Sequence, residues 1–501
     1  IDQALAKMPR GPARDEKLVS FYMQAQRALS ALQTTRMTEN GNAVFRMVSS
    51  GARAKPEQLF QITNGPTLVT DGTGRIVPHA IKKSFSEGLD FSDWWIHLHG
   101  ARKSVVAKTS GVREPSYLAK QFIASTLDQV VTIRDCGTTQ GILLPVTDRN
   151  AQNRYLAKPI VAGGRKYPAG LLVDAKLAGA LAAAGASELE VRSPLRCRAA
   201  QGICSMCYGA AIDGHAVEMG TNVGIQASHA IGEPSSQMSL SSFHEGGVAG
   251  AKSSGARDLF QRLKQLTYLP ERMPMRATLA TKGGLVEAVA NAPGGGWNVT
   301  VGGTPYHVAH SIGLGVKKGQ KVSKGQSLSD PKSSVPDPRD VLAIRGMGPA
   351  QDLLTSQIQD VVARVSPSTQ RRNTEVLVRA MTSLTKIHGR GTHPTLLPGD
   401  ETNLARVEVW NATHAKDPKA QVSHTPTIRG VNTLPLEMQE DWLARLAFER
   451  QRQTILEAAR GGWETDFAGI NPIPSLSMGL LPHGVEERRK ERGKKREPRR
   501  A

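Results

Sequence analysis

Four cysteines carry the clearest chemical signal in this sequence. Cys197, Cys204 and Cys207 follow the pattern C-x6-C-x2-C, and Cys136 lies upstream in the segment RDCGTTQG. Four thiolates bind one zinc ion tetrahedrally, and such a site ties distant segments of a chain together. The spacing therefore predicts a structural zinc site made by these four residues.

Two other interpretations of the cysteines stay open at this point. The C-x2-C spacing also occurs in redox motifs, and buried cysteines can be chemically inert. Gly202 and Gly209 lie beside the sulfurs, and they favour zinc because the turns between ligands need conformations that glycine adopts readily. In a reducing compartment no disulfide framework is expected.

A second segment, residues 224–263, mixes helix-forming residues with residues that weaken helices. It reads GIQASHAIGEPSSQMSLSSFHEGGVAGAKSSGARDLFQRL, with Gly232 and Pro234 in its first half and His244 near its centre. Such a segment can form two helices, but it cannot hold them firmly together. We therefore interpret it as a moving part. A lone histidine is more often structural than catalytic, so the assignment of His244 depends on its context.

The composition predicts a polyanionic partner. The 501 residues include 64 Lys and Arg and 44 Asp and Glu, which gives a formal net charge of +20. A charge of this size favours binding to polyanions. No apolar run approaches the roughly 18 residues of a membrane span, and no leader pattern is present at the start, so neither a membrane nor secretion is expected. The basic residues 485–501 are expected to add nonspecific, salt-sensitive affinity for nucleic acid.

Long helices are expected to position these residues. Residues 14–38 are charged, apolar-periodic and free of Pro and Gly, which predicts an exposed helix. Residues 67–81 are typical of a hairpin. Residues 84–127 predict a second long helix, but Pro115 removes a backbone donor and crowds the carbonyl of Gly111. We expect one helix over residues 92–125 that keeps its direction and is disturbed between Gly111 and Pro115.

Several motifs together resemble one family. HGARKS, DCGTTQG, CRAAQGICSMCYG and NVGIQASHAIGEPSSQMSLSSFHEGG occur in the order found in the C-terminal half of the largest subunit of multisubunit RNA polymerases, called β′ in bacteria. NAVFRMVSSGAR is similar to the loop that supports the active-site helices. Residues 84–127 resemble the bridge helix, and residues 224–263 resemble the trigger loop. The resemblance runs over nearly the whole chain.

The resemblance implies an α+β fold of several modules. GVKKGQKVSKGQSLSD, with turns at Gly319 and Gly325, is similar to the β-rich sandwich-barrel hybrid element of the family. The expected modules are rim helices with an active-site support loop (1–64), a hairpin and bridge helix (65–127), a four-cysteine zinc module (128–215), the trigger-loop hairpin (216–265), the small β-rich element (266–335), a C-terminal helical region (336–484) and a basic tail (485–501).

The resemblance also assigns roles within the trigger loop. In the family this loop folds against the bridge helix when the matched nucleoside triphosphate binds, and it unfolds afterwards. Gln237 would approach the ribose, Leu240 would pack on the incoming base, and His244 would reach the leaving phosphates as a positional or acid catalyst. Ser241 stands where bacterial enzymes usually have arginine, so one phosphate contact is expected to be lost.

The expected bridge helix departs further from the family. Its ends match, but its middle reads AKTSGVREPS where the family usually has a Lys-Thr-Ala core. Val112 and Arg113 fall where residues normally face the nascent base pair. Arg102 and Lys103 are candidates for contacts with the nucleic-acid backbone, with a solvated helix face as the alternative.

The resemblance implies that catalytic Mg²⁺ is bound elsewhere. The family's magnesium loop, Asn-Ala-Asp-Phe-Asp-Gly-Asp, does not occur in this sequence. An N-terminal β′-like subunit is therefore expected to carry it. Further expected partners are β-like subunits, a DNA template, an RNA transcript, nucleoside triphosphates and a promoter-specificity factor.

A split and divergent subunit is expected to come from a bacteriophage. Split subunits of plastids and cyanobacteria carry a long insertion in the trigger loop, whereas 12 residues separate His244 from Arg257 here. The expected location is the cytoplasm of the bacterial host, with packaging in a virion left open.

The sequence thus predicts the C-terminal β′-like subunit of a DNA-directed RNA polymerase, a nucleotidyltransferase that is active only in a complex. A non-catalytic, zinc-containing nucleic-acid-binding factor on a polymerase-derived scaffold is the alternative. Such a binder would be free to lose His244 and the neighbouring glycines, which this chain keeps. A single-chain polymerase is opposed by the missing aspartates.

Overall fold

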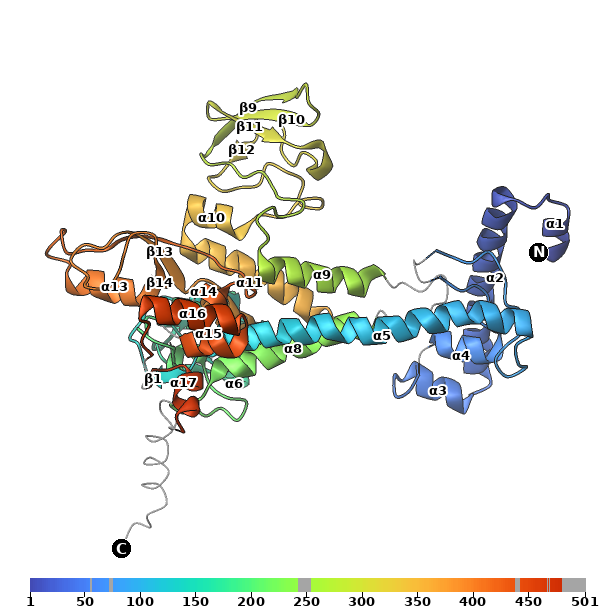
Figure 1. The fold of residues 1–501 in the computed structure, drawn as a ribbon, viewed down its shortest axis with the longest axis horizontal. Helices are drawn as coiled ribbons and strands as arrows, with labels where there is room; N and C mark the ends of the chain where they lie inside the picture. The colour runs from blue at the N-terminus through green and yellow to red at the C-terminus, as the bar shows by residue number, and fades with distance from the viewer. Residues whose placement is uncertain are drawn as a thin grey trace, which may run out of the picture. The chain divides into compact units, whose positions relative to one another are not determined.

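The computed structural model describes residues 1–54, 56–71, 75–241, 254–437, 442–465, 467 and 469–479. The chain divides into two compact units. The first contains Ile1–Tyr117 and Ser235–Gln261, and the second contains Leu118–Pro234 and Arg262–Ala501. Two long helices, α5 (Phe91–Thr126) and α8 (Val223–Ser241), contribute residues to both units (Figure 1).

The start of the first unit is helical. Its helices before α5 are α1 (Asp2–Ala6), α2 (Pro12–Glu39), α3 (Ala43–Ser49) and α4 (Pro56–Thr63). Helix α2 has proline in its first turn, where the missing N–H would have no intrahelical partner. No described side chain along α2 is buried. The long exposed helix predicted over residues 14–38 is confirmed.

The predicted hairpin before α5 is also present. Residues Thr67 and Ile81 form an antiparallel bridge, as do Thr70 and Ile76. Leu68, Val69 and Ile81 are buried, so both arms contribute apolar side chains to the interior. The tip of the hairpin, residues 72–74, lies outside the described residues.

Helix α5 is continuous, and its bounds agree closely with the helix expected over residues 92–125. The backbone N–H and the hydroxyl of Ser84 both donate to Glu87 at 2.8 Å, and this turn precedes the helix. The helix then runs from Phe91 to Thr126 with Pro115 inside it, so it keeps its direction as expected (Figure 1). Despite its length, neither α5 nor any other described helix is apolar enough to cross a membrane.

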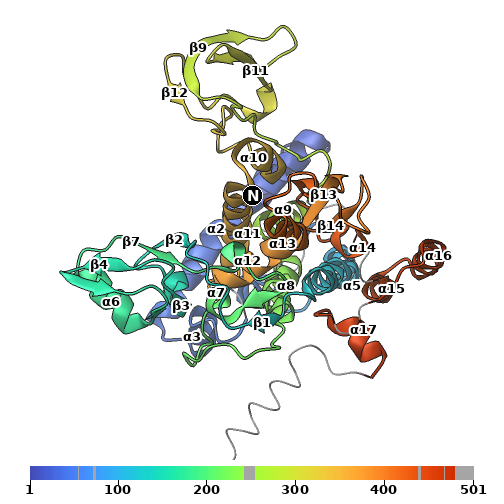
Figure 2. The ribbon, with the colours of Figure 1, turned by 90° about the vertical axis from the view of Figure 1, so that its left-hand side faces the viewer.

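A small module of short strands lies between α5 and α8 in sequence. Antiparallel pairs join β2 to β7, β3 to β6 and β4 to β5, and a parallel pair joins β1 to β8. Strands β2, β3, β4 and β7 and helix α6 of this module lie together in Figure 2. Leu181, Leu189 and Val191 are fully buried in its apolar core. The elements are β1 (Val131–Ile133), β2 (Ile142–Pro145), η1 (Arg149–Ala151), β3 (Arg154–Tyr155), β4 (Ile160–Ala162), β5 (Arg165–Tyr167), β6 (Leu172–Val173), α6 (Ala175–Ala183), β7 (Glu188–Val191), η2 (Pro194–Arg196), β8 (Ile203–Cys204) and α7 (Ser205–Tyr208).

Helix α8 passes through Gly232 and Pro234 without a break. We expected these residues to weaken a helix, and the structure places both inside one helix. A second helix, α9 (Ser254–Tyr268), follows, and residues 242–253 between the two helices lie outside the described residues.

The predicted β-rich element is a four-stranded antiparallel sheet. Its order is β11 (Thr304–Val308), β10 (Trp297–Val301), β9 (Gly284–Asn291) and β12 (Lys321–Val322), with the short turn η3 (His310–Ile312) after β11. It forms the yellow lobe in Figures 1 and 2. Gly319 and Gly325 have φ of +83° and +80°, so the turns expected at both glycines are confirmed.

The C-terminal region is less purely helical than expected. Strand β13 (Leu384–Gly389) lies between β14 (Glu401–Asn403) and β15 (Ser423–Pro426) in an antiparallel sheet. The alternation in LTKIHG buries Thr385 and Ile387 and exposes the residue between them, which suits a strand. The helices are α10 (Pro338–Arg345), α11 (Met347–Ala363), α12 (Arg371–Met381), α13 (Leu404–Thr413), α14 (Leu434–Glu437), α15 (Trp442–Phe448), α16 (Gln451–Gly461) and α17 (Pro472–Ser477).

Candidate metal centre and paired helices

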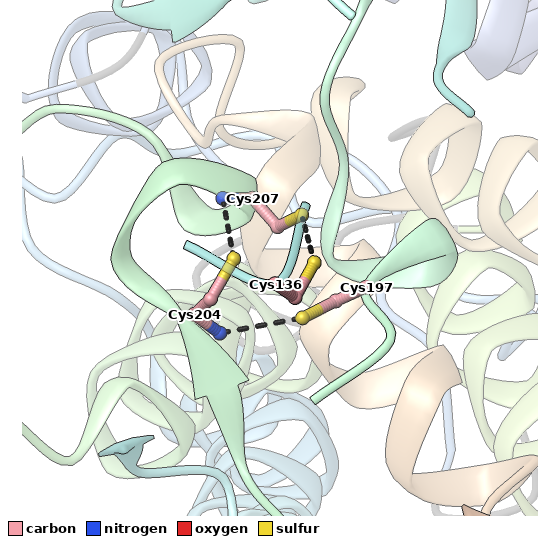
Figure 3. Close-up of side chains that lie close together, drawn as sticks. All are labelled: Cys136, Cys197, Cys204 and Cys207. Carbon is pink, nitrogen blue, oxygen red and sulfur yellow. Dashed lines mark hydrogen bonds between the residues drawn. The ribbon is translucent and has the colours of Figure 1, made fainter. Parts of the chain in front are cut away.

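The structure brings together the four cysteines that the sequence singled out. Their sulfur atoms all lie within 4.8 Å of one another and point toward a common centre (Figure 3). The Sγ atoms of Cys136 and Cys207 are 3.7 Å apart. A tetrahedral site with Zn–S bonds of about 2.3 Å needs sulfurs separated by about 3.8 Å. The cluster therefore fits one zinc ion, and its convergence favours zinc over a two-cysteine redox motif.

Backbone donors orient three of the sulfurs. The N–H of Cys204 donates to Cys197 Sγ at 3.3 Å, and the N–H of Cys207 donates to Cys204 Sγ at 3.3 Å. The N–H of Arg198 donates to Cys136 Sγ at 3.4 Å. Such donors stabilise negative charge on sulfur and fix the direction of each ligand.

The cysteines strongly perturb one another's protonation. Hydrogen bonds from Cys197 and the other thiols to Cys136 hold the pKa of Cys136 well below its usual range. The bond that Cys207 makes with Cys136 raises the pKa of Cys207, since losing its proton would remove that donor. These opposite pKa shifts arise because the thiols share protons. A bound cation would remove the opposition because it favours the thiolate form of every ligand.

Two glycines shape the loops that carry the cysteines. Gly202 has φ +62°, and a Cβ atom there would lie 2.2 Å from the carbonyl oxygen of Val130. Gly209 has φ +98°, and a Cβ atom there would lie 2.4 Å from the carbonyl oxygen of Asn153. The turns therefore require glycine at both positions, as the sequence suggested.

Arg379 of α12 holds the cysteine loop, and the sequence analysis missed it. Its guanidinium donates to the carbonyl oxygens of Cys197 at 2.9 Å and of Gly202 at 3.0 Å. It also donates to those of Pro194 at 3.0 Å and Ala199 at 3.5 Å. Nothing in the spacing links an arginine in RRNTEVLVRAM to cysteines so far upstream, and only the tertiary fold reveals this contact.

A buried ion pair joins the same module to α12. Arg154 donates two hydrogen bonds to Glu375, at 2.7 and 2.9 Å, and their side chains are 2% and 0% exposed. Ser193 donates to this carboxylate at 2.7 Å, and Arg371 donates to it at 3.2 Å. Burial raises the pKa of Glu375, but the two guanidiniums and these hydrogen bonds outweigh it, so that the pKa is lowered. The carboxylate is thus charged and fully partnered.

Within the second unit, α5 and α8 pack closely through small residues. The hydroxyls of Thr126 and Ser228 are 2.8 Å apart. A Cβ atom on Gly224 would lie 1.9 Å from the carbonyl oxygen of Thr126, and one on Gly232 would lie 3.0 Å from Ala119 Cβ. The two helices are therefore antiparallel here, with their backbones close together.

Within the first unit, the same helices are joined by Ser239 and Gly111. The hydroxyl of Ser239 donates to the carbonyl oxygen of Gly111 at 2.8 Å. Proline at position 115 has no N–H for this carbonyl, and the hydroxyl replaces the missing intrahelical donor. This bond gives a physical reason for the regular helix around Pro115.

The predicted nucleic-acid and nucleotide residues are only partly described. Arg102, Val112 and Arg113 are exposed on α5, and Gln237 is exposed on α8. The side chains of Lys103, Leu240 and Ser241, together with the whole of His244, lie outside the described part of the chain. Their predicted roles stay predictions.

Residues 88–287, which include α5, the cysteine module and both α8 and α9, match the family RNA polymerase Rpb1, domain 5.

The chain is also similar to bacterial β′ subunits of DNA-directed RNA polymerase. The subunit of Paenarthrobacter aurescens is 30% identical over 505 residues, which cover 94% of this chain and 37% of that subunit. The subunit of Clavibacter sepedonicus is 30% identical with the same two coverages, and that of Lysinibacillus sphaericus is 28% identical over 97% of this chain and 40% of its own length. The chain is therefore a bacterial-type β′ homologue that spans well under half the length of these relatives.

Proposed function

We propose that this chain supplies the bridge helix and the trigger loop of a DNA-directed RNA polymerase. The observation that carries the proposal is the alignment of almost the whole chain with β′ subunits. Helix α5 is proposed as the bridge helix, and the segment from α8 to α9 as the trigger loop. Support comes from the close packing of α5 against α8, which brings the two predicted elements into contact.

The cysteine cluster is proposed as a structural zinc site. Cys136, Cys197, Cys204 and Cys207 would provide all four ligands, which leaves no open position for a substrate. When bound, zinc would hold the loops after β1 and η2 to α7. Support comes from the distances between sulfurs and from Arg379, which braces the loop without approaching as a ligand.

Nucleotide addition asks the protein mainly for positioning and for stabilisation of charge near the phosphates. We propose that His244 acts on the leaving phosphates, that Gln237 contacts the ribose, and that Leu240 packs on the base, with Ser241 in the place of a phosphate-contacting arginine. Arg102 and Lys103 are proposed to contact the nucleic-acid backbone, and Val112 and Arg113 to face the nascent base pair. The exposure of Arg102, Val112, Arg113 and Gln237 supports their part of this assignment because exposed side chains are accessible to ligands.

Catalytic Mg²⁺ would supply charge stabilisation at the reacting phosphates. Its aspartate ligands are absent from this sequence, and we place them on a separate N-terminal β′-like chain. The other proposed partners are β-like subunits, DNA, RNA, nucleoside triphosphates and a promoter-specificity factor. The proposed setting is a bacteriophage polymerase working in the host cytoplasm or packaged in a virion.

Purification through a tag on this chain tests the assembly. Mass spectrometry of the bound chains should identify a partner that carries the aspartate loop and a β-like partner. The complex should extend a primed template with Mg²⁺, and this chain by itself should not. Robust synthesis by the chain alone would contradict the proposal.

The residue-level test is single-nucleotide addition on a preassembled scaffold. His244→Ala should slow addition by about tenfold to a thousandfold, the range lost when one positional or acid group is removed. Template affinity should be nearly unchanged because it depends on diffuse positive charge. His229→Ala, an exposed histidine on α8, is the matched control. Equal rates for His244→Ala and wild type at saturating substrate would favour the non-catalytic zinc-containing binder.

A further inference from the structure

Two helices of this protein contain an internal proline, and both prolines leave a carbonyl without its usual donor. Pro115 lies inside α5, and Pro234 lies inside α8. Because proline has no N–H, the carbonyl four residues earlier receives no intrahelical hydrogen bond from it. These carbonyls belong to Gly111 and Ala230.

A hydroxyl from another element reaches each of these carbonyls. Ser239 donates to Gly111 at 2.8 Å, and Thr369 donates to Ala230 at 3.4 Å. The Thr369 hydroxyl also lies 3.0 Å from Ser366 Oγ, so its single hydrogen is shared between two acceptors. The Ser239 contact is the shorter of the two and has the geometry of a full hydrogen bond.

Burial around the hydrogen bond between Ser239 and Gly111 increases the cost of losing that bond. Ser239 is 9% exposed and Pro115 is buried, and Gly111 itself is half-buried, so water has limited access to the Gly111 carbonyl. A buried carbonyl without a donor destabilises the folded arrangement, and removing one partner costs more than the bond contributes on average. The position of Ser239 against α5 is therefore tied to the presence of proline at position 115.

We propose that Ser239 is a positioning residue that sets the register of residues 235–241 against α5 through the carbonyl that Pro115 frees. The bond forms only when the last turns of α8 are helical and seated on α5. This inference rests on the proposed function for its catalytic consequence, because Gln237, Leu240 and Ser241 lie in the same turns. Its structural part concerns only described residues.

A double-mutant cycle tests whether the effect of Ser239 depends on the proline at position 115. Ser239→Ala removes the donor, whereas Pro115→Ala restores an N–H that can bond to the Gly111 carbonyl within α5. Amide hydrogen exchange of residues 235–241 is measured in the purified complex of the full chain without nucleotide. Ser239→Ala should raise exchange by about two- to tenfold when Pro115 is present and by less than about twofold in the Pro115→Ala background.

Two further variants separate this contact from general loss of packing. Ser239→Thr keeps the hydroxyl and should restore protection, and Thr369→Val should leave exchange of residues 235–241 unchanged. The same increase in exchange in both backgrounds, or no increase in either, would overturn the proposal. Single-nucleotide addition is measured in parallel, and Ser239→Ala is expected to lower its maximal rate by about the same factor as protection. An exchange effect without a rate effect would leave the contact standing and count against the trigger-loop assignment.

Discussion

The cysteine module and the α5–α8 pair are stabilised in opposite ways. Around the cysteines, backbone donors reach three sulfurs, and Arg379 bonds to four carbonyls of one loop. The buried carboxylate of Glu375 ties the same module to α12. Ser228 and Ser239 join α8 to α5 through hydrogen bonds between neutral groups.

If the proposed function holds, this difference separates a fixed part of the chain from a part that must unfold and refold. Hydrogen bonds to charged groups contribute about 1.5–3 kcal/mol each, and neutral ones about 0.5–1.5 kcal/mol. Several charged bonds acting together keep the cysteine module in one arrangement. Under the proposed function, neutral bonds between helices that contain glycine and proline would leave two arrangements within a few kcal/mol of each other, which a ligand could then select.

The largest effect is expected from removing a zinc ligand. The wild-type chain should contain about one zinc per molecule. Cys207→Ser should lose this zinc and unfold the cysteine module, because structural zinc contributes about 10–16 kcal/mol to such folds. Elemental analysis and limited proteolysis measure both effects. Met206→Leu changes the neighbouring residue and should keep the metal. A Cys207→Ser chain that folds normally without metal would end the zinc assignment and remove the contrast between the two regions.

A smaller but still large effect is expected at Glu375. Glu375→Gln leaves the buried Arg154 without its counter-charge and should lower stability by about 3–5 kcal/mol. Urea unfolding followed by a probe in the cysteine module measures the change. The exposed Glu188→Gln variant is the control and should be nearly neutral. A neutral Glu375→Gln would mean that the module is less firmly tied to α12 than the contacts indicate.

The same residue predicts a dependence on pH. Because the pKa of Glu375 is lower in the folded chain, its contribution is fully present above the unfolded value, about 4.3. The contribution is then lost as the pH falls through the lower, folded value. Wild type should therefore lose stability below about pH 4 more steeply than Glu375→Gln. Parallel curves for the two chains would assign the acid sensitivity to other groups.

The smallest loss of stability is expected for Gly232→Ala on α8, and Gly224→Ala on the same helix is the comparison. Gly224→Ala would place a methyl group 1.9 Å from a backbone oxygen of α5, which must shift, so a loss of about 2 kcal/mol or more is expected. Gly232→Ala would place it 3.0 Å from Ala119 Cβ. There the better helix propensity of alanine, about 1 kcal/mol, largely offsets the contact. Thermal unfolding compares the two variants, and equal losses would show that α8 packs as tightly at Gly232 as at Gly224.

The sequence predicted the parts of the fold that depend on local pattern. The exposed helix α2, the hairpin before α5 and the turns at Gly319 and Gly325 follow from apolar periodicity and glycine placement. The three-stranded sheet around β13 was missed. Strand β13 follows α12 almost directly, so its apolar residues continue the apolar pattern of that helix and no local signal marks the change to a strand. Helix α5 keeps its direction past Pro115, as expected, and α8 also continues through Pro234. Hydroxyls from other elements reach the carbonyls that both prolines free, and local rules do not include such donors.

In the candidate site, too, the sequence predicted the residues that follow a local pattern and missed those that depend on tertiary contacts. The four cysteines were found from spacing because metal ligands recur in short patterns. Arg379 and Glu375 were not found because their partners are far away in sequence and their roles depend on tertiary contacts. The residues expected to touch nucleotides were placed by resemblance alone.

The distance in sequence between Arg379 and the cysteine loop sets an order for biogenesis. Cys197 precedes Arg379 by 182 residues. At about 5–20 residues per second, a ribosome needs roughly ten to forty seconds to make the intervening chain. All four thiols emerge before their arginine brace exists, and during this interval they are exposed to oxidation. Zinc captured early would protect them, and the arrival of α12 would then close the loop over an ion already in place.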